Sequence, residues 1–204
     1  RGVTPDSLGP RVAERVFVTR HIKEHMPEAF DFDIPSVCAI APGVLGVTGV
    51  ETMDIVFGVA NKVKPDLIIA VDALASRRAA RISTTIQLSD SGISPGSGVG
   101  NTRADLSRAN LGVPVIAVGV PLVVYASTIS QDTISLIADE TGLHGDEARL
   151  RELAEQVIAK HMGDFIVTPK DIDVIVEDMA GIIANAINSA LFGNNLEQVR
   201  NMLA

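Results

Sequence analysis

The sequence predicts an α/β fold: a three-layer sandwich with a mostly parallel or mixed sheet and additional helices at the carboxyl end. Two apolar runs, residues 67–71 and 115–120, have the length of buried strands. Segments with helical patterning precede and follow them, which is typical of α/β proteins. Hydrophobic residues make up 47% of the 204 positions, enough for one sizeable core. We therefore treat residues 1–204 as a single domain.

In the first half of the chain, helices are expected to alternate with strands. A helix is expected over residues 5–25, with Thr4 as its cap and a proline at its first position. A short strand over residues 37–41 is followed by a capping box and a helix over residues 49–62. The strand over residues 67–71 comes next.

The second half begins with short elements and ends in long helices. We expect a short helix over residues 76–81, a β-rich segment over 84–88 and a glycine-rich loop over 90–101. Prolines bracket the strand over residues 115–120. Helices are predicted over residues 123–140, 146–161 and 169–192, and those after residue 140 would form a lid or an extension.

Composition excludes several classes of protein. Aromatic residues are only 3% of the chain and tryptophan is absent, which disfavours stacking on single-stranded nucleic acid. The net charge of −8 disfavours polyanionic partners. The single Cys38 lies in an apolar run, where we expect a buried thiol in a reducing compartment. No apolar stretch of about 20 residues stands out, so we expect a cytoplasmic protein without membrane contact.

Asp6 and Asp72 are the candidate catalytic residues. Asp72 follows the apolar run at residues 67–71, so it is expected at the carboxyl end of a strand. Asp6 lies where a loop is expected to enter a helix. Open α/β sheets place their chemistry at such positions. Each acid also has a structural explanation, as a partner of backbone amides or of the helix dipole. If the two carboxylates meet, they could share a proton and act as general acid and base.

Other chemistries are weakly supported. The glycine-rich loop lacks the Lys-Ser/Thr ending of a P-loop and does not fit the dinucleotide fingerprint. His21 and His25 share a helical face, but no acidic partner motif accompanies them. A serine nucleophile is disfavoured, because no Gly-x-Ser-x-Gly pattern is accompanied by a suitable downstream histidine. We therefore expect neither a metal nor a cofactor. Arg77 follows Asp72 closely in sequence and is a candidate substrate-binding residue.

Five segments, taken together and in order, closely resemble the germination protease family of spore-forming Firmicutes. They are TPDSLGP at residues 4–10, PGVLGVTGVET at 42–52, AVDALASR at 70–77, PGSGVGN at 95–101 and VTPKDID at 167–173. The resemblance covers nearly the whole chain and is far more specific than any one of the segments.

The resemblance implies an endopeptidase of atypical aspartic type that degrades small acid-soluble spore proteins during germination, in the cytoplasm of the spore core. It implies a homotetramer made as a zymogen, with Asp6 and Asp72 as the critical acids. It also implies a fold similar to that of hydrogenase maturation proteases. We expect the chain to lack the amino-terminal propeptide and the strand before Asp6. Two alternatives remain: a metal-dependent maturation-type protease using the same acids as ligands, and a catalytically silent binding protein.

Overall fold

The computed structural model describes residues 5–26, 28, 32–94, 104–142, 145–161, 163 and 165–203. Its elements, in chain order, are η1 (Pro5–Ser7), α1 (Leu8–Ala13), α2 (Arg20–His25), α3 (Leu45–Thr48), α4 (Thr52–Val63), β1 (Ile68–Ser76), η3 (Ala79–Arg81), β2 (Gln87–Ser89), α5 (Arg108–Leu111), β3 (Val115–Tyr125), α6 (Ala126–Thr141), α7 (Glu147–His161), β4 (Ile166–Val167), α8 (Ile172–Phe192), η5 (Gly193–Asn195) and α9 (Leu196–Leu203).

A mixed sheet forms the centre of the fold, which confirms the α/β class. β3 is the central strand: it pairs in parallel with β1 and antiparallel with both β2 and β4. β3 is almost entirely buried, as expected for a strand covered on both faces. Within the described residues, β1 pairs only with β3 and is therefore an edge strand.

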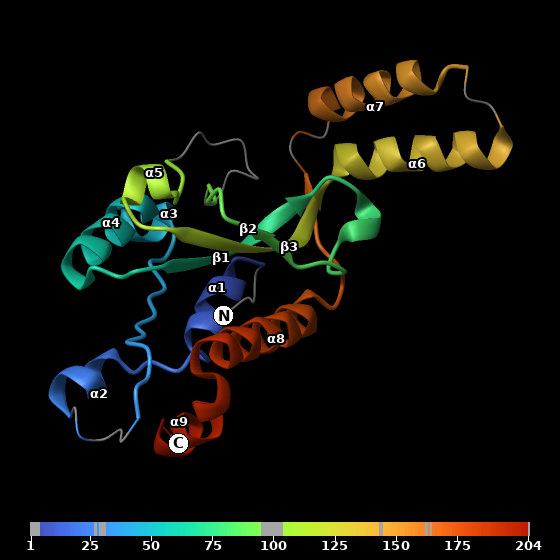
Figure 1. The fold of residues 1–204 in the computed structure, drawn as a ribbon. Helices are drawn as coiled ribbons and strands as arrows, with labels where there is room; N and C mark the ends of the chain where they lie inside the picture. The colour runs from blue at the N-terminus through green and yellow to red at the C-terminus, as the bar shows by residue number, and fades with distance from the viewer. Residues whose placement is uncertain are drawn as a thin grey trace.

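Helices cover both faces of the sheet, giving three layers (Figure 1). On one face, α1 and α8 pack against β1 and β3, and their shared core includes Leu8, Val120, Leu122, Val176 and Ala180. On the other face, α4 and α5 contribute to a second cluster around Leu106, Leu111 and Val115. A third cluster joins α9 to the end of α8.

Helix α6 and helix α7 form a hairpin that projects away from the sheet (Figure 1). Of their described residues, only Ala138 and Ile158 are buried. The predicted helices after residue 140 therefore include an extension, whereas α8 belongs to the core.

Both principal strands are longer than predicted. β3 continues through Pro121, although proline usually ends a strand because it lacks an N–H donor. Leu74 is paired with Pro121 and Ala75 with Val123, so the register shifts beside the proline. A bulge of this kind accommodates the missing donor. β1 likewise continues to Ser76, so Asp72 lies within the strand and not at its carboxyl end.

The amino-terminal helix is shorter than predicted. Instead of one helix over residues 5–25, the chain forms η1, α1 and α2 with an extended segment between α1 and α2. That segment includes the β-branched residues Val16, Val18 and Thr19, which have low helix propensity. Thr4, the predicted cap, lies outside the described residues.

The strand predicted over residues 37–41 does not form, and Cys38 is exposed. The backbone of Val37 instead accepts hydrogen bonds from the N–H groups of Thr19 and Arg20. Because this segment joins no sheet, nothing buries the cysteine as the sequence pattern had suggested.

The helical stretch Ile172–Leu203 is long and apolar enough to cross a membrane, judged by length and composition alone. The sequence analysis had expected no apolar stretch of that length. Val176, Ala180, Ile183 and Ala184 are buried in the core at helical spacing. A core helix of a globular protein shows this pattern as well.

Candidate active site

Asp72 is held by the central sheet. Its backbone pairs with Gly119 of β3, and its side chain is half-buried. The carboxylate oxygen Oδ1 accepts a hydrogen bond of 2.9 Å from the N–H of Ala73. The side chain of Leu74 lies over Gly119, where an added Cβ would come within 2.3 Å of it. The position of Asp72 is therefore fixed by strand pairing and by close packing around it.

Asp6 is held differently, in the single turn η1 that precedes α1. Asp6 is exposed, whereas Leu8, two positions later, is fully buried. η1 contacts both β1 and α8. Asp6 thus lies on the solvent side of a turn whose neighbour anchors it in the core.

A glycine allows the two segments to approach closely. A Cβ on Gly9 would lie 2.9 Å from the carbonyl oxygen of Val71, so only glycine permits this contact between α1 and β1. Val71 is the residue before Asp72. The structure therefore brings together the backbone segments that carry the two predicted acids, although they are 66 positions apart in sequence.

The two acids are associated with different faces of β1. Val71 and Ala73 pack toward α1 and α8, while Ile68 and Ala70 pack toward α4 and α5. Because side chains alternate along a strand, Asp72 belongs to the α4–α5 face. η1 leads into α1 on the opposite face. The edge of β1 that is unpaired within the described residues separates the two faces.

Arg77 is exposed just beyond the end of β1. It comes five positions after Asp72, which corresponds to about 16 Å of extended chain. Its loop is fixed by a hydrogen bond of 2.7 Å from the N–H of Ala79 to the carboxylate of Asp132 on α6. Arg77 therefore lies beyond the end of β1, away from Asp72, and its substrate-binding role stays a prediction.

The glycine-rich segment at residues 96–100 lies outside the described residues, but the base of its loop is defined. Ile93 and Leu106 exchange two backbone hydrogen bonds, of 3.1 and 2.7 Å. Gly92, at φ +92°, packs directly against Leu106 and Ser107. Ile93 and Leu106 belong to the same cluster as Ala70, so the loop begins and ends on the Asp72 face of the sheet.

No group of three or more His, Cys, Asp or Glu residues is placed to hold a metal within the part of the chain that the structure describes. A hollow of about 110 Å³ lies between Tyr125, Phe165 and the α6–α7 hairpin. Tyr125 is six residues further along β3 than Gly119, the neighbour of Asp72, so this hollow is separate from the two acids.

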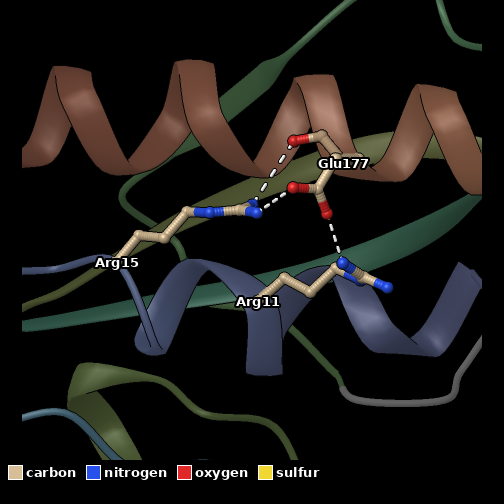
Figure 2. Close-up of polar contacts among 3 residues, drawn as sticks. All are labelled: Arg11, Arg15 and Glu177. Carbon is tan, nitrogen blue, oxygen red and sulfur yellow. Dashed lines mark hydrogen bonds and ion pairs between the residues drawn. The ribbon is translucent and has the colours of Figure 1, made fainter.

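Two residues of α8 that the sequence does not indicate as functional, Glu177 and Asn188, bind α1 and the residues that follow it. Glu177 of α8 forms ion pairs with Arg11 and Arg15 (Figure 2). Asn188 of α8, only 3% exposed, accepts a hydrogen bond from the Phe17 N–H and donates one to the Arg15 carbonyl oxygen. The spacing of four between Arg11 and Arg15 was a usable signal, but nothing in the sequence indicated the partner.

These features define an α/β protein with two acids on adjoining segments of a helix and an edge strand. Comparison with known proteins identifies the family. The family model described as germination protease matches residues 1–148 and 141–202. The chain belongs to the germination protease family.

Individual relatives agree with the family match. The germination protease of Clostridium tetani (strain Massachusetts / E88) is 46% identical over 204 residues, covering 93% of this chain and 62% of the relative. That of Clostridium acetobutylicum is 47% identical, with coverage of 93% and 62%. That of Caldanaerobacter subterraneus subsp. tengcongensis is 47% identical, with coverage of 98% and 66%. The chain thus spans somewhat under two thirds of the length of these relatives.

Proposed function

We propose that this chain carries the catalytic acids of an endopeptidase that degrades small acid-soluble spore proteins during germination. Membership of the germination protease family supports a peptidase. The observation that supports this site is the close approach of Gly9, three residues after Asp6, to the carbonyl oxygen of Val71, the residue before Asp72.

In the proposed mechanism, Asp6 and Asp72 hold a water molecule between them across the edge of β1. One carboxylate is ionised and takes a proton from the water, while the other is protonated and donates a hydrogen bond to the scissile carbonyl. The water oxygen then attacks the carbonyl carbon, and the carbonyl oxygen takes the proton of the protonated acid. The C–N bond breaks as the acid that took the proton from water passes it to the leaving nitrogen, and the other carboxylate takes a proton back from the hydroxyl group that remains on the carbon. Acid/base assistance of this kind typically contributes about 10²–10⁴-fold. In a pair of carboxyl groups that share one proton, neither role is assigned to one residue.

The chain has few aromatic residues, so we expect aromatic stacking to contribute little to substrate binding. Its net charge of −8 would attract substrates with basic segments. Arg77 would steady a carbonyl or carboxylate of the substrate several residues from the scissile bond. On the basis of the family resemblance, we further propose that the protein is made as a zymogen and forms a tetramer. We propose on the same basis that it is located in the cytoplasm of the spore core.

The test is digestion of a small acid-soluble spore protein by the complete gene product and by its Asp6→Asn and Asp72→Asn variants. Each variant is expected to lose at least about 100-fold in kcat. Unfolding midpoints close to that of the parent would show that both variants remain folded. Full activity in either folded variant would sink the paired-carboxylate mechanism.

Two further arms of the experiment separate the alternatives. If chelation abolishes activity and added metal restores it, the two acids act as metal ligands and not as a proton-sharing pair. If the parent protein does not digest the substrate and Asp72→Asn leaves its other measurable properties unchanged, the chain is a catalytically silent binding protein on this fold.

A further inference from the structure

The orientation of α1 depends on contacts with other elements. α1 has only six residues, too few for a helix to be stable alone. Leu8 and Val12 attach it to the core that includes Val176 and Ala180 of α8. Hydrophobic contacts of this kind are not directional. They hold α1 against α8, but they fix its rotation about its own axis less tightly.

Directional contacts to α8 supply that restraint. The carboxylate of Glu177 lies between two guanidinium groups, binding Arg11 through one oxygen and Arg15 through the other (Figure 2). Arg15 also donates a hydrogen bond of 3.4 Å to the carbonyl oxygen of Glu177. Charge-assisted hydrogen bonds are strong and geometrically specific. Because Arg11 and Arg15 are one helical turn apart, one carboxylate fixes two points along α1 and the turn that follows it.

We propose that Glu177 is a positioning residue for Asp6: by holding Arg11 and Arg15, it sets the rotation of α1 and hence the direction in which the Asp6 carboxylate points. This inference rests on the proposed function. In this proposal, α8, near the carboxyl end of the chain, positions Asp6, whereas pairing with β3 positions Asp72.

A small rotation of α1 would displace the Asp6 carboxylate far enough to affect catalysis. A side chain on a helix ends about 6 Å from the helix axis. A rotation of α1 by about 10° about its own axis would therefore move the Asp6 carboxylate by about 1 Å. A misplacement of about 1 Å can cost about 10²-fold in rate.

The effect on stability should be small by contrast. The Glu177 side chain is 46% exposed, and those of Arg11 and Arg15 are 31% and 34% exposed. Ion pairs as exposed as these contribute little to folding. A positioning role therefore predicts a change in activity that exceeds any change in stability.

The experiment compares Glu177→Gln with Asp178→Asn in the complete gene product. Asp178 is the next residue on α8. It is exposed and makes no hydrogen bond or ion pair with the other described residues. Both substitutions remove one negative charge and preserve side-chain size. Three quantities are measured: kcat and KM on a small acid-soluble spore protein, the thermal unfolding midpoint, and amide hydrogen exchange in residues 5–16.

For Glu177→Gln we expect kcat to fall about 10-fold or more with KM within about twofold, since positioning affects the chemical step. Exchange in residues 5–16 should rise, and the unfolding midpoint should move by no more than about 4 °C. Asp178→Asn should match the parent in all three measurements.

Four results would overturn the proposal: an unchanged kcat in Glu177→Gln, unchanged exchange in residues 5–16, a loss of activity no larger than the loss of folded protein, or an equal effect of Asp178→Asn. Absence of proteolysis in the parent protein would overturn the proposed function instead. The exchange measurement would then decide alone whether Glu177 fixes α1.

Discussion

The body of the protein and the α6–α7 hairpin both contain long helices but bury them to very different extents. In the body, Leu8, Val120, Leu122, Val176 and Ala180 are fully buried between α1, α8 and the sheet. In the hairpin, apolar side chains such as Leu136, Ile137 and Val157 are more than half exposed. The segments that carry the two candidate acids, η1 and β1, both make their main contacts with the closely packed body and not with the hairpin.

The largest expected contrast is in core truncation. Leu122→Ala removes a fully buried side chain from β3 and should lower the free energy of unfolding by about 2–5 kcal/mol. Leu153→Ala, on α7 with its residue 44% exposed, should change it by less than about 0.5 kcal/mol. Urea unfolding of both variants measures the difference. Equal losses would show that the hairpin is packed as tightly as the body.

Two glycines with positive φ give the next contrast. Gly92→Ala, at φ +92°, would force a Cβ to within 2.3 Å of the Leu106 carbonyl oxygen, so we expect a loss of about 2–4 kcal/mol. Gly142, at the end of α6, has φ +68°, but a Cβ there would meet no atom of the described residues within 4 Å. For Gly142→Ala we therefore expect only the backbone cost, about 1 kcal/mol. A similar shift in the unfolding midpoints of both variants would contradict this assignment.

Buried hydrogen bonds provide a smaller contrast. Asn188→Ala leaves the Phe17 N–H and the Arg15 carbonyl without their partner and should cost about 1–3 kcal/mol. Ser135→Ala removes the hydrogen bond of 2.8 Å to Glu147 that links α6 to α7 and should cost less than about 1 kcal/mol. Denaturant unfolding monitored by circular dichroism separates the two. A loss in Ser135→Ala as large as that in Asn188→Ala would contradict the contrast.

The smallest effect concerns local opening in the unmodified protein. Few buried apolar contacts hold the hairpin, so its amides should exchange through local opening, whereas those around Val176 in α8 should exchange only at a cost close to global unfolding. Native-state hydrogen exchange measures both. Equal protection of α7 and α8 would show that another part of the protein covers the hairpin.

Local sequence patterns were sufficient for some elements and misleading for others. The helix predicted over residues 146–161 agrees closely with α7, and the strand predicted over residues 115–120 forms the first part of β3. The helix predicted over residues 5–25 was wrong in its middle, because Asn188 and the segment around Val37 bind the backbone there. These partners are distant in sequence and leave no local signal.

The candidate acids show the same division. Sequence resemblance singled out Asp6 and Asp72, and their segments do meet. Asp72 was nevertheless expected at a strand end, whereas β1 continues for four more residues because its parallel partner β3 also continues past Pro121. The length of a strand depends on its neighbour, which hydrophobic patterning along one segment does not reveal.

By itself, the sequence determined the fold class, the family and the two acids to test, because these depend on hydrophobic periodicity and on motifs that are local in the chain. Tertiary structure decided the strand register that pairs Asp72 with Gly119 and the close approach of Gly9 to Val71. It also decided the ion pairs of Glu177 with Arg11 and Arg15. Each of these is a contact between segments far apart in sequence, and such contacts are selected only when the whole core packs.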